Sequence, residues 1–167
     1  HMIEAGEGEP PVPYAMLVLG SGGRGESLLA MDQDNAIVYA SGDAGGPEDQ
    51  WFEKLGSRVA DTLNDAGVDY CKGGIMARNA AWRKNLNAWI DTVEQWVTHA
   101  DPQDILSSDI FYDAKTVYGD WDLANRLREK SFTLASGSTN FIKFHTLKAA
   151  DFRVPLGLFN RFKLDNG

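Results

Sequence analysis

A glycine-rich segment is a candidate binding site for phosphate groups. Residues 20–26 include four glycines within their first six positions, directly after a short apolar run. Because glycine tolerates positive φ and close backbone approach, this segment can turn its N–H groups toward an anion. A helix that begins there would add a dipole that favours negative charge. The candidate phosphate ligands are therefore Gly20, Ser21, Gly22 and Arg24.

Two aspartates follow at a spacing that suits a metal ion. Asp32 and Asp34 stand at positions i and i+2 where the next apolar run begins, so both side chains are expected on one face of a strand. Mg²⁺ prefers carboxylate oxygens, with phosphate oxygens and water completing its coordination. Metal ions held there would neutralise a triphosphate, activate an attacking hydroxyl and stabilise the leaving pyrophosphate. We therefore predict that Asp32 and Asp34 are catalytic ligands for Mg²⁺, with Mn²⁺ as an alternative ion.

Simpler explanations exist for each of these residues. An Asp-x-Asp pair also occurs in solvated turns, and Arg24 could pair with Glu26 at the surface. The segment is not a P-loop, since it lacks Gly-Lys-Ser/Thr, and no acidic residue closes a dinucleotide-binding unit after it. The glycines and the aspartates together still favour a site for a polyphosphate and its metal ions.

A second glycine-containing segment, residues 71–79, could flank the same nucleotide. Its candidate ligands are Lys72, Arg78 and Asn79. An ordinary connection, with Asn79 as a helix cap, explains these residues equally well. Cys71 is the single cysteine of the chain, so no internal disulfide can form, and we expect it to be buried as an apolar filler.

The composition indicates one acidic, compact domain. The chain has 167 residues, of which 43% are apolar, and this is enough for a well-buried core. Its 16 basic and 24 acidic side chains give a formal net charge of −8, which disfavours broad binding to nucleic acid. No signal peptide and no membrane span is predicted. We therefore expect a cytoplasmic protein.

The order of the predicted elements indicates an α+β fold. Apolar runs at residues 16–19 and 36–40 predict buried strands, with helix-forming residues 26–31 between them. Residues 68–76 could form a third strand that is broken by two glycines. Helical spacing of apolar residues, including three tryptophans at intervals of seven, predicts helices at 48–66, 82–99, 104–118, 122–135 and 140–149. We therefore expect a small mixed sheet followed by a helical region.

The sequence resembles a known superfamily of enzymes. Gly20-Ser21, ten intervening residues and then Asp32-Gln33-Asp34 resemble the signature of the DNA polymerase beta-like nucleotidyltransferases. More narrowly, the chain resembles the nucleotidyltransferase domain found beside cyclic-nucleotide-binding and CBS domains in bacterial signalling proteins. That domain is related to the uridylyltransferase that modifies nitrogen-regulatory proteins. The resemblance lies in four blocks: GSGGRGESLLAMDQDNAIVY, CKGGIMARNAAWR, FYDAKTVYGD and FHTLKAADFRVPLGLF.

The resemblance implies transfer of a nucleoside monophosphate from a triphosphate to a hydroxyl acceptor, with a protein as one candidate acceptor. It implies that the glycine segment and Arg24 bind the phosphates and that the paired aspartates bind magnesium. The superfamily often has a third carboxylate on a later strand, and the candidates are Asp69, Asp109 and Asp113. Asp113 is preferred because it lies in a resembling block, although that stretch is itself predicted to be helical.

The resemblance also implies sensor domains as partners in a longer protein. We expect a tag remnant and linker over residues 1–13, a nucleotidyltransferase core over 14–100, and a helical extension, cut from a longer chain, over 101–167. Two other functions stay open. The domain could sense a nucleotide without turning it over, or it could be a protein-interaction domain whose site has decayed.

Overall fold

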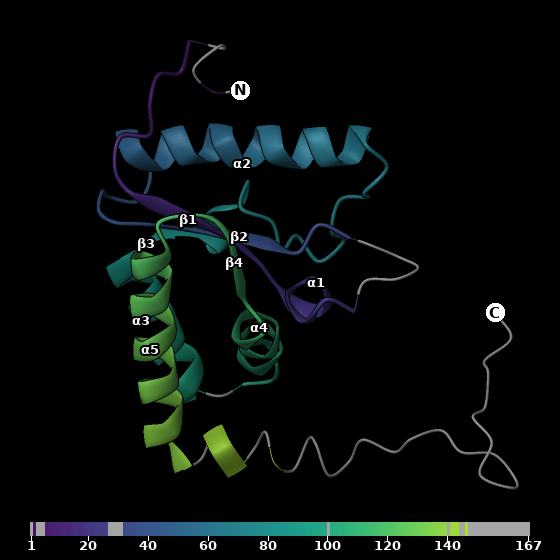
Figure 1. The fold of residues 1–167 in the computed structure, drawn as a ribbon. Helices are drawn as coiled ribbons and strands as arrows, with labels where there is room; N and C mark the ends of the chain where they lie inside the picture. The colour runs from purple at the N-terminus through teal and green to yellow at the C-terminus, as the bar shows by residue number, and fades with distance from the viewer. Residues whose placement is uncertain are drawn as a thin grey trace, which may run out of the picture.

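Three layers make up the fold, with a sheet in the middle. The computed structural model describes Met2 and residues 6–26, 32–99, 101–139, 141–143 and 146. Helix α2 (Pro47–Asp65) covers one face of the sheet, and α3 (Leu86–His99) and α5 (Trp121–Gly137) cover the other (Figure 1). This arrangement confirms the predicted α+β class.

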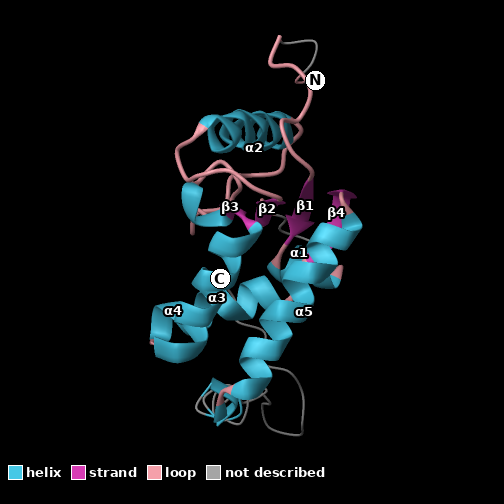
Figure 2. Ribbon diagram, turned by 90° about the vertical axis from the view of Figure 1, so that its left-hand side faces the viewer, coloured by secondary structure: helices cyan, strands magenta, loops and turns pink. Residues whose placement is uncertain are grey.

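The sheet is mixed, as the sequence predicted. Its strands are β1 (Tyr14–Val18), β2 (Asn35–Tyr39), β3 (Arg83–Asn85) and β4 (Lys115–Gly119), in the order β3-β2-β1-β4 (Figure 2). β1 runs antiparallel to both β2 and β4, whereas β2 and β3 are parallel. Every residue of β2 is buried, because helices cover both faces of this central strand. The two predicted strands are therefore confirmed as β1 and β2, although only alternate residues of β1 are fully buried.

The helices begin at residues suited to helix starts. Pro47 opens α2 and is followed by two acidic residues, which favour the positive end of the helix dipole. Asp101 caps α4 (Pro102–Tyr112) and Asp120 caps α5, each through its carboxylate. Two short elements are the five-residue α1 (Gly20–Arg24) and the 3₁₀ turn η1 (Ala80–Trp82). Within the described residues, no helix is both long and apolar enough to cross a membrane.

The three tryptophans at intervals of seven pack together in the core. Trp82, Trp89 and Trp96 are buried and contact one another edge-on or at a tilt, and Phe111 of α4 stacks on Trp89. The indole Nε1 of Trp89 also donates a hydrogen bond of 2.9 Å to the carbonyl of Ile37 in β2. This bond fixes α3 against the centre of the sheet.

Two predicted elements were wrong. The helix predicted at 104–118 ends at Tyr112, and residues 115–119 form β4. Thr116, Val117 and Tyr118 are strand formers, and the segment pairs with the open side of β1 except at Val117, where the register shifts. The strand predicted at 68–76 is absent apart from an isolated bridge between Asp69 and Asp32. Turn bonds such as Gly74 N–H to Cys71 C=O replace it, and β3 at 83–85 takes the place beside β2.

Other boundaries differ or lie outside the described residues. The helix predicted from residue 82 begins at Leu86, because η1 and β3 occupy the residues before it. Residues 27–31, and most of the helix predicted at 140–149, lie outside the described part of the chain. β4 comes after residue 100 and pairs with β1 before it, so the sheet draws on both of the predicted regions. The division at residue 100 stays a prediction.

A buried ion pair ties α2 to β3. The Arg83 guanidinium donates to the Asp49 carboxylate at 2.8 Å and to the carbonyls of Ala77 and Arg78 at 3.0 and 2.9 Å. Burial acts to raise the pKa of Asp49. The hydrogen bond and charge of Arg83, with hydrogen bonds from the Gly45 N–H and the Tyr39 hydroxyl, outweigh it and hold that pKa below its usual value. The network positions the loop that precedes β3.

We predict that Arg83→Met destabilises the protein by about 3–5 kcal/mol, because it leaves the Asp49 carboxylate buried without its partner. Urea unfolding followed by far-UV circular dichroism measures this loss. Lys54→Met is the matched control, since Lys54 forms an exposed pair with Glu7 and should contribute at most about 1 kcal/mol. A loss for Arg83→Met no greater than that of the control would contradict the structural role of the pair.

Candidate functional site

The structure brings the two predicted metal ligands together. Asp32, Asp34 and Cys71 each offer one ligand atom, and these atoms lie within 4.8 Å of one another. Asp32 is exposed, Asp34 is half-buried and Cys71 is buried, as expected for the cysteine. Within the described residues, this acidic group includes none of the three candidates for a third carboxylate.

Hydrogen bonds from distant segments hold the two aspartates in place. The Leu19 N–H donates to the Asp34 carbonyl at 2.9 Å, which joins the end of β1 to the start of β2. Asn35 is buried, and its N–H donates to the Ile75 carbonyl while its Oδ1 accepts from the Ala77 N–H. These bonds bring the segment that contains Cys71 against the aspartates.

Gln33, between the two aspartates, is a second anchor. Its side chain is buried and donates to the carbonyls of Ala60 in α2 and of Val68 at 2.9 and 2.8 Å. Since alternate residues of an extended chain point to opposite sides, burying Gln33 leaves Asp32 and Asp34 on the other side. Gln33 and Asn35 were not predicted as site residues. The feature that could have identified them is a pair of amide side chains next to the aspartates, at the start of an otherwise apolar strand.

The negative charge of the Asp34 carboxylate is only partly compensated by its neighbours. Burial raises its pKa above the usual value, the Cys71 thiol opposes that rise, and the negative charge of Asp32 adds to it. Its Oδ1 atom is buried and makes no hydrogen bond within the part of the chain that the structure describes. An ionised carboxylate oxygen that is buried without a partner is costly, and a bound cation would remove that cost.

Cys71 acts as a neutral neighbour rather than as a thiolate. Burial raises the pKa of its thiol, and the adjacent Asp34 carboxylate raises it further. At neutral pH the thiol therefore keeps its proton. The donors that remain are the oxygens of the two carboxylates, and these suit a hard cation such as Mg²⁺.

Gly20 lets the Asp34 carboxylate approach the glycine segment. It has a φ of 52°, and a Cβ placed on it would lie 3.0 Å from Oδ2 of Asp34. The segment predicted as a turn forms the short helix α1, and the first N–H groups of any helix lack partners within it. Ser21 and Gly22 belong to this first turn. The candidate phosphate ligands and the candidate metal ligands are thus neighbours through Gly20.

Arg24 contacts carboxylates at the other end of α1. It donates to Glu26 at 2.8 Å and to Asp113, the residue that follows α4. Gly23 makes this close packing possible, since a Cβ there would overlap the backbone carbonyl of Asp113. Asp109 lies one turn earlier in α4 and lines a surface hollow together with Arg24 and Asp113. The structure therefore pairs Arg24 with the preferred third carboxylate.

The second glycine segment is braced by its own side chains. Asn79 donates to the Gly74 carbonyl at 2.6 Å and does not cap η1 through its side chain. Arg78 pairs with Asp61 of α2 at 3.2 Å and lies over the ring of Tyr70. Lys72 is exposed and lies next to Cys71. Of the three candidate ligands, Lys72 is therefore the one adjacent in sequence to the acidic group.

A family model matches the chain. Searches of curated proteins and of solved structures found nothing that matches the chain. The model of the family described as "Putative nucleotidyltransferase DUF294" matches residues 1–103, which is more than half of the chain and includes α1, both aspartates and the second glycine segment. Given this match, together with the paired carboxylates beside a glycine-rich helix start, the chain belongs to this nucleotidyltransferase family.

Proposed function

We propose that this domain transfers a nucleoside monophosphate from a nucleoside triphosphate to a hydroxyl acceptor, with Mg²⁺ held by Asp32 and Asp34. One observation carries the proposal: two carboxylates meet beside Gly20, and one buried oxygen of Asp34 lacks a hydrogen-bond partner among the described residues. The family match supports the reaction class. The identity of the acceptor, a signalling role and a cytoplasmic location are part of the proposal.

The donor set fits magnesium. Asp32 and Asp34 supply hard oxygen ligands, whereas Cys71 stays protonated and would not compete as a soft ligand. When bound, Mg²⁺ would supply charge neutralisation for the triphosphate and for the departing pyrophosphate. Mn²⁺ has the same preference for oxygen donors and is an alternative ion.

The chain's own groups would orient the triphosphate. The first N–H groups of α1, at Gly20, Ser21 and Gly22, would donate hydrogen bonds to phosphate oxygens. A phosphate near Arg24 would compete with Asp113 for the guanidinium, because both are anions that bind it through charge-assisted hydrogen bonds. Release of Asp113 would then free a third carboxylate. Lys72 is a further candidate cation, while Arg78 and Asn79 would support the loop that carries it.

A nucleotide sensor without turnover is the second candidate function. It is favoured by one observation: Asp113 is paired with Arg24, and the described acidic group has only two carboxylates. Such a site would bind a triphosphate with its metal ion and would not transfer it. A domain that has lost its site and only binds proteins is less well supported, since the glycine and aspartate residues are all present.

We predict that Asp34→Asn stabilises the ligand-free protein at neutral pH and abolishes its stabilisation by Mg²⁺ and a triphosphate. Because burial raises the pKa of Asp34, its favourable contribution is present below the unfolded-state pKa and is lost as the pH rises through the folded-state pKa. The amide removes that pH-dependent loss and also the metal ligand. In the wild type, ligand at a hundredfold excess over Kd should add about 2.7 kcal/mol.

Thermal unfolding with each of the four triphosphates, with and without Mg²⁺, measures both effects. Asp91→Asn is the matched control, because Asp91 is an exposed residue of α3. It should behave like the wild type in every condition. If Asp34→Asn retained the full ligand-dependent rise in Tm, the proposed metal site would be wrong.

We predict that Gly20→Ala weakens Mg²⁺-dependent triphosphate binding, because its methyl group would press on the Asp34 carboxylate. Both Gly20 and Gly25 have positive φ, so alanine at either position should cost roughly 1–2 kcal/mol of stability. Gly25→Ala is therefore the matched control, since nothing lies within 4 Å of its added Cβ. Equal loss of triphosphate binding in the two variants, measured by calorimetry, would show that contact with Asp34 is irrelevant.

A transfer assay separates the enzyme from the sensor. We predict that incubation with labelled triphosphates and bacterial lysate releases pyrophosphate and labels an acceptor. The double variant Asp32→Asn, Asp34→Asn should lower this rate roughly a hundredfold or more, because metal ions supply several kcal/mol of transition-state stabilisation and each 1.36 kcal/mol is tenfold. Saturable triphosphate binding without pyrophosphate release would instead support the sensor.

A further inference from the structure

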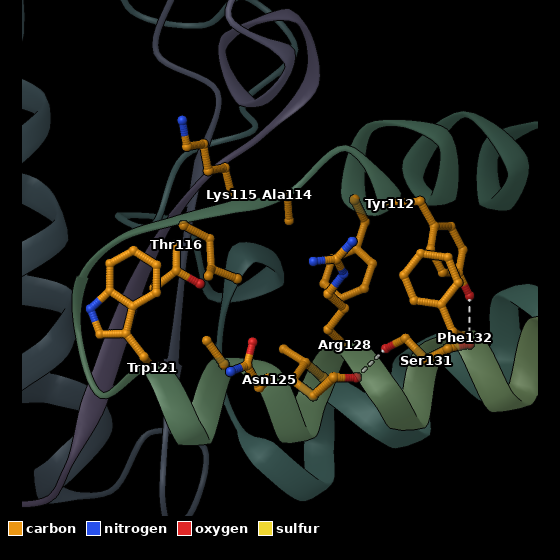
Figure 3. A pocket seen from close by; sticks show the side chains of 13 residues that line it. Tyr112, Ala114, Lys115, Thr116, Trp121, Asn125, Arg128, Ser131 and Phe132 are labelled. Carbon is orange, nitrogen blue, oxygen red and sulfur yellow. Dashed lines mark hydrogen bonds between the residues drawn. The ribbon is translucent and has the colours of Figure 1, made fainter.

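A cavity of about 160 Å³ lies between β4 and α5, next to the end of α4 (Figure 3). Its floor is apolar and buried, and it is formed by Leu17 of β1, Phe111 of α4 and Leu127 of α5. Its rim is one stripe of α5 at helical spacing, made of Trp121, Asn125, Arg128 and Phe132. The cavity therefore combines an apolar floor with a polar and aromatic rim.

Two large aromatic side chains at this rim are accessible to water. Trp121 is 56% exposed and Phe132 is 47% exposed. Figure 3 shows Trp121 at one end of the cavity, Phe132 at the other and Arg128 between them. Aromatic groups that line a hollow and remain exposed are typical of ligand sites, because a planar ligand can bury them.

Three polar groups at the cavity have unused hydrogen-bonding capacity. Within the described residues, the Thr116 hydroxyl, the Asn125 amide and the Arg128 guanidinium form no side-chain hydrogen bond or ion pair. The Arg128 guanidinium lies over the ring of Phe132, at 5.5 Å from its centre. The other hydroxyls are satisfied: Tyr112 donates to the Ser131 carbonyl, and Ser131 donates to the Leu127 carbonyl.

The charge of the cavity is opposite to that of the whole chain. None of the described residues that line it is acidic, although the chain has a formal net charge of −8. Lys115 also lines the cavity, but its side chain runs away from α5, so Arg128 is the cation that reaches the space (Figure 3). An unpaired guanidinium between aromatic groups favours an anion.

The size of the cavity limits the enclosed part of the ligand to one ring. A cavity of about 150 Å³ can hold benzene. The space beside α5 is close to that volume, so a single six-membered ring fits and a larger fused system would have to protrude. The anionic group of the ligand would then lie at the rim, near Arg128.

We propose that this cavity is a second binding site, for a small anion that carries one planar ring. The ring lies against Trp121, the acidic group binds Arg128, and polar atoms of the ring bind Asn125 and Thr116. Pyrimidine nucleoside monophosphates and hydroxylated aromatic carboxylates share this chemistry. The site requires neither Mg²⁺ nor the proposed transfer reaction. Its occupant would contact β1, the strand that leads into α1.

Calorimetric titration in the presence of EDTA tests the proposal, because a chelator removes any contribution of a metal ion at Asp32 and Asp34. The probes are uridine 5′-monophosphate, 4-hydroxybenzoate and inorganic phosphate. We expect one of the two ring-bearing probes to bind with one-to-one stoichiometry, and phosphate alone to bind at least about tenfold more weakly. The ring-bearing probe that binds identifies the class of ligand.

Variants locate the bound probe. Arg128→Gln should weaken its binding at least about tenfold, because a charge-assisted hydrogen bond is lost. Arg126→Gln is the matched control, since Arg126 is an exposed residue of the same helix that does not line the cavity. Trp121→Ala should weaken binding as well, whereas Asp34→Asn should leave it unchanged. Circular dichroism checks that each variant folds.

Four results would overturn the proposal. They are an absence of saturable binding by both ring-bearing probes, equal binding of phosphate alone, equal weakening by the variants at 126 and 128, and loss of binding in Asp34→Asn. The last result would assign the probe to the aspartate site. Because the titration contains no metal ion, failure of this proposal leaves the outcome of the transfer assay unaffected.

Discussion

The start of β2 is held by hydrogen bonds from several segments, and the geometry of the candidate site depends on them. Leu19 at the end of β1 donates to the Asp34 carbonyl, and Asn35 binds the backbone of Ile75 and Ala77. Each of these bonds joins segments that are far apart in the sequence. These bonds hold three groups close together: the glycine segment, the aspartates and Cys71.

The fold keeps the charge of the Asp34 carboxylate partly buried, which is electrostatically unfavourable. Burial and the charge of Asp32 both raise the pKa of Asp34, and its Oδ1 lacks a partner among the described residues. Elsewhere, the buried Asp49 is paired with Arg83 and has a lowered pKa. The contrast between these two acids indicates that the fold compensates buried charge where it is structural. Compensation of Asp34 is the role that we propose for Mg²⁺, and perturbed carboxylates of this kind are common at functional sites.

β4 links the candidate site to the cavity between β4 and α5. It pairs with β1, whose residue Leu17 forms part of the cavity floor and whose end leads into α1. The strand also follows Asp113, the residue that holds Arg24. A single strand and its preceding turn therefore contact both places where an anion is proposed to bind. This gives the second half of the described chain a direct structural connection to the segment that the family model matches.

The sequence alone determined the elements whose signals are local. Apolar runs defined β1 and β2, helical spacing defined α2 and α5, and the i, i+2 spacing put Asp32 and Asp34 on one side of the chain. The family was also evident, because its motif is a short run of residue types at fixed spacing. These features depend on neighbours in the chain, so they can be read without the fold.

Tertiary structure decided the rest. Residues 115–119 became a strand because β1 offered an open edge, and residues 68–76 became turns because β3 occupied the place beside β2. The pairing of Arg24 with Asp113 and the approach of Cys71 to Asp34 join residues that are distant in sequence. Such contacts depend on which surfaces meet when the core packs, and no local pattern encodes that choice.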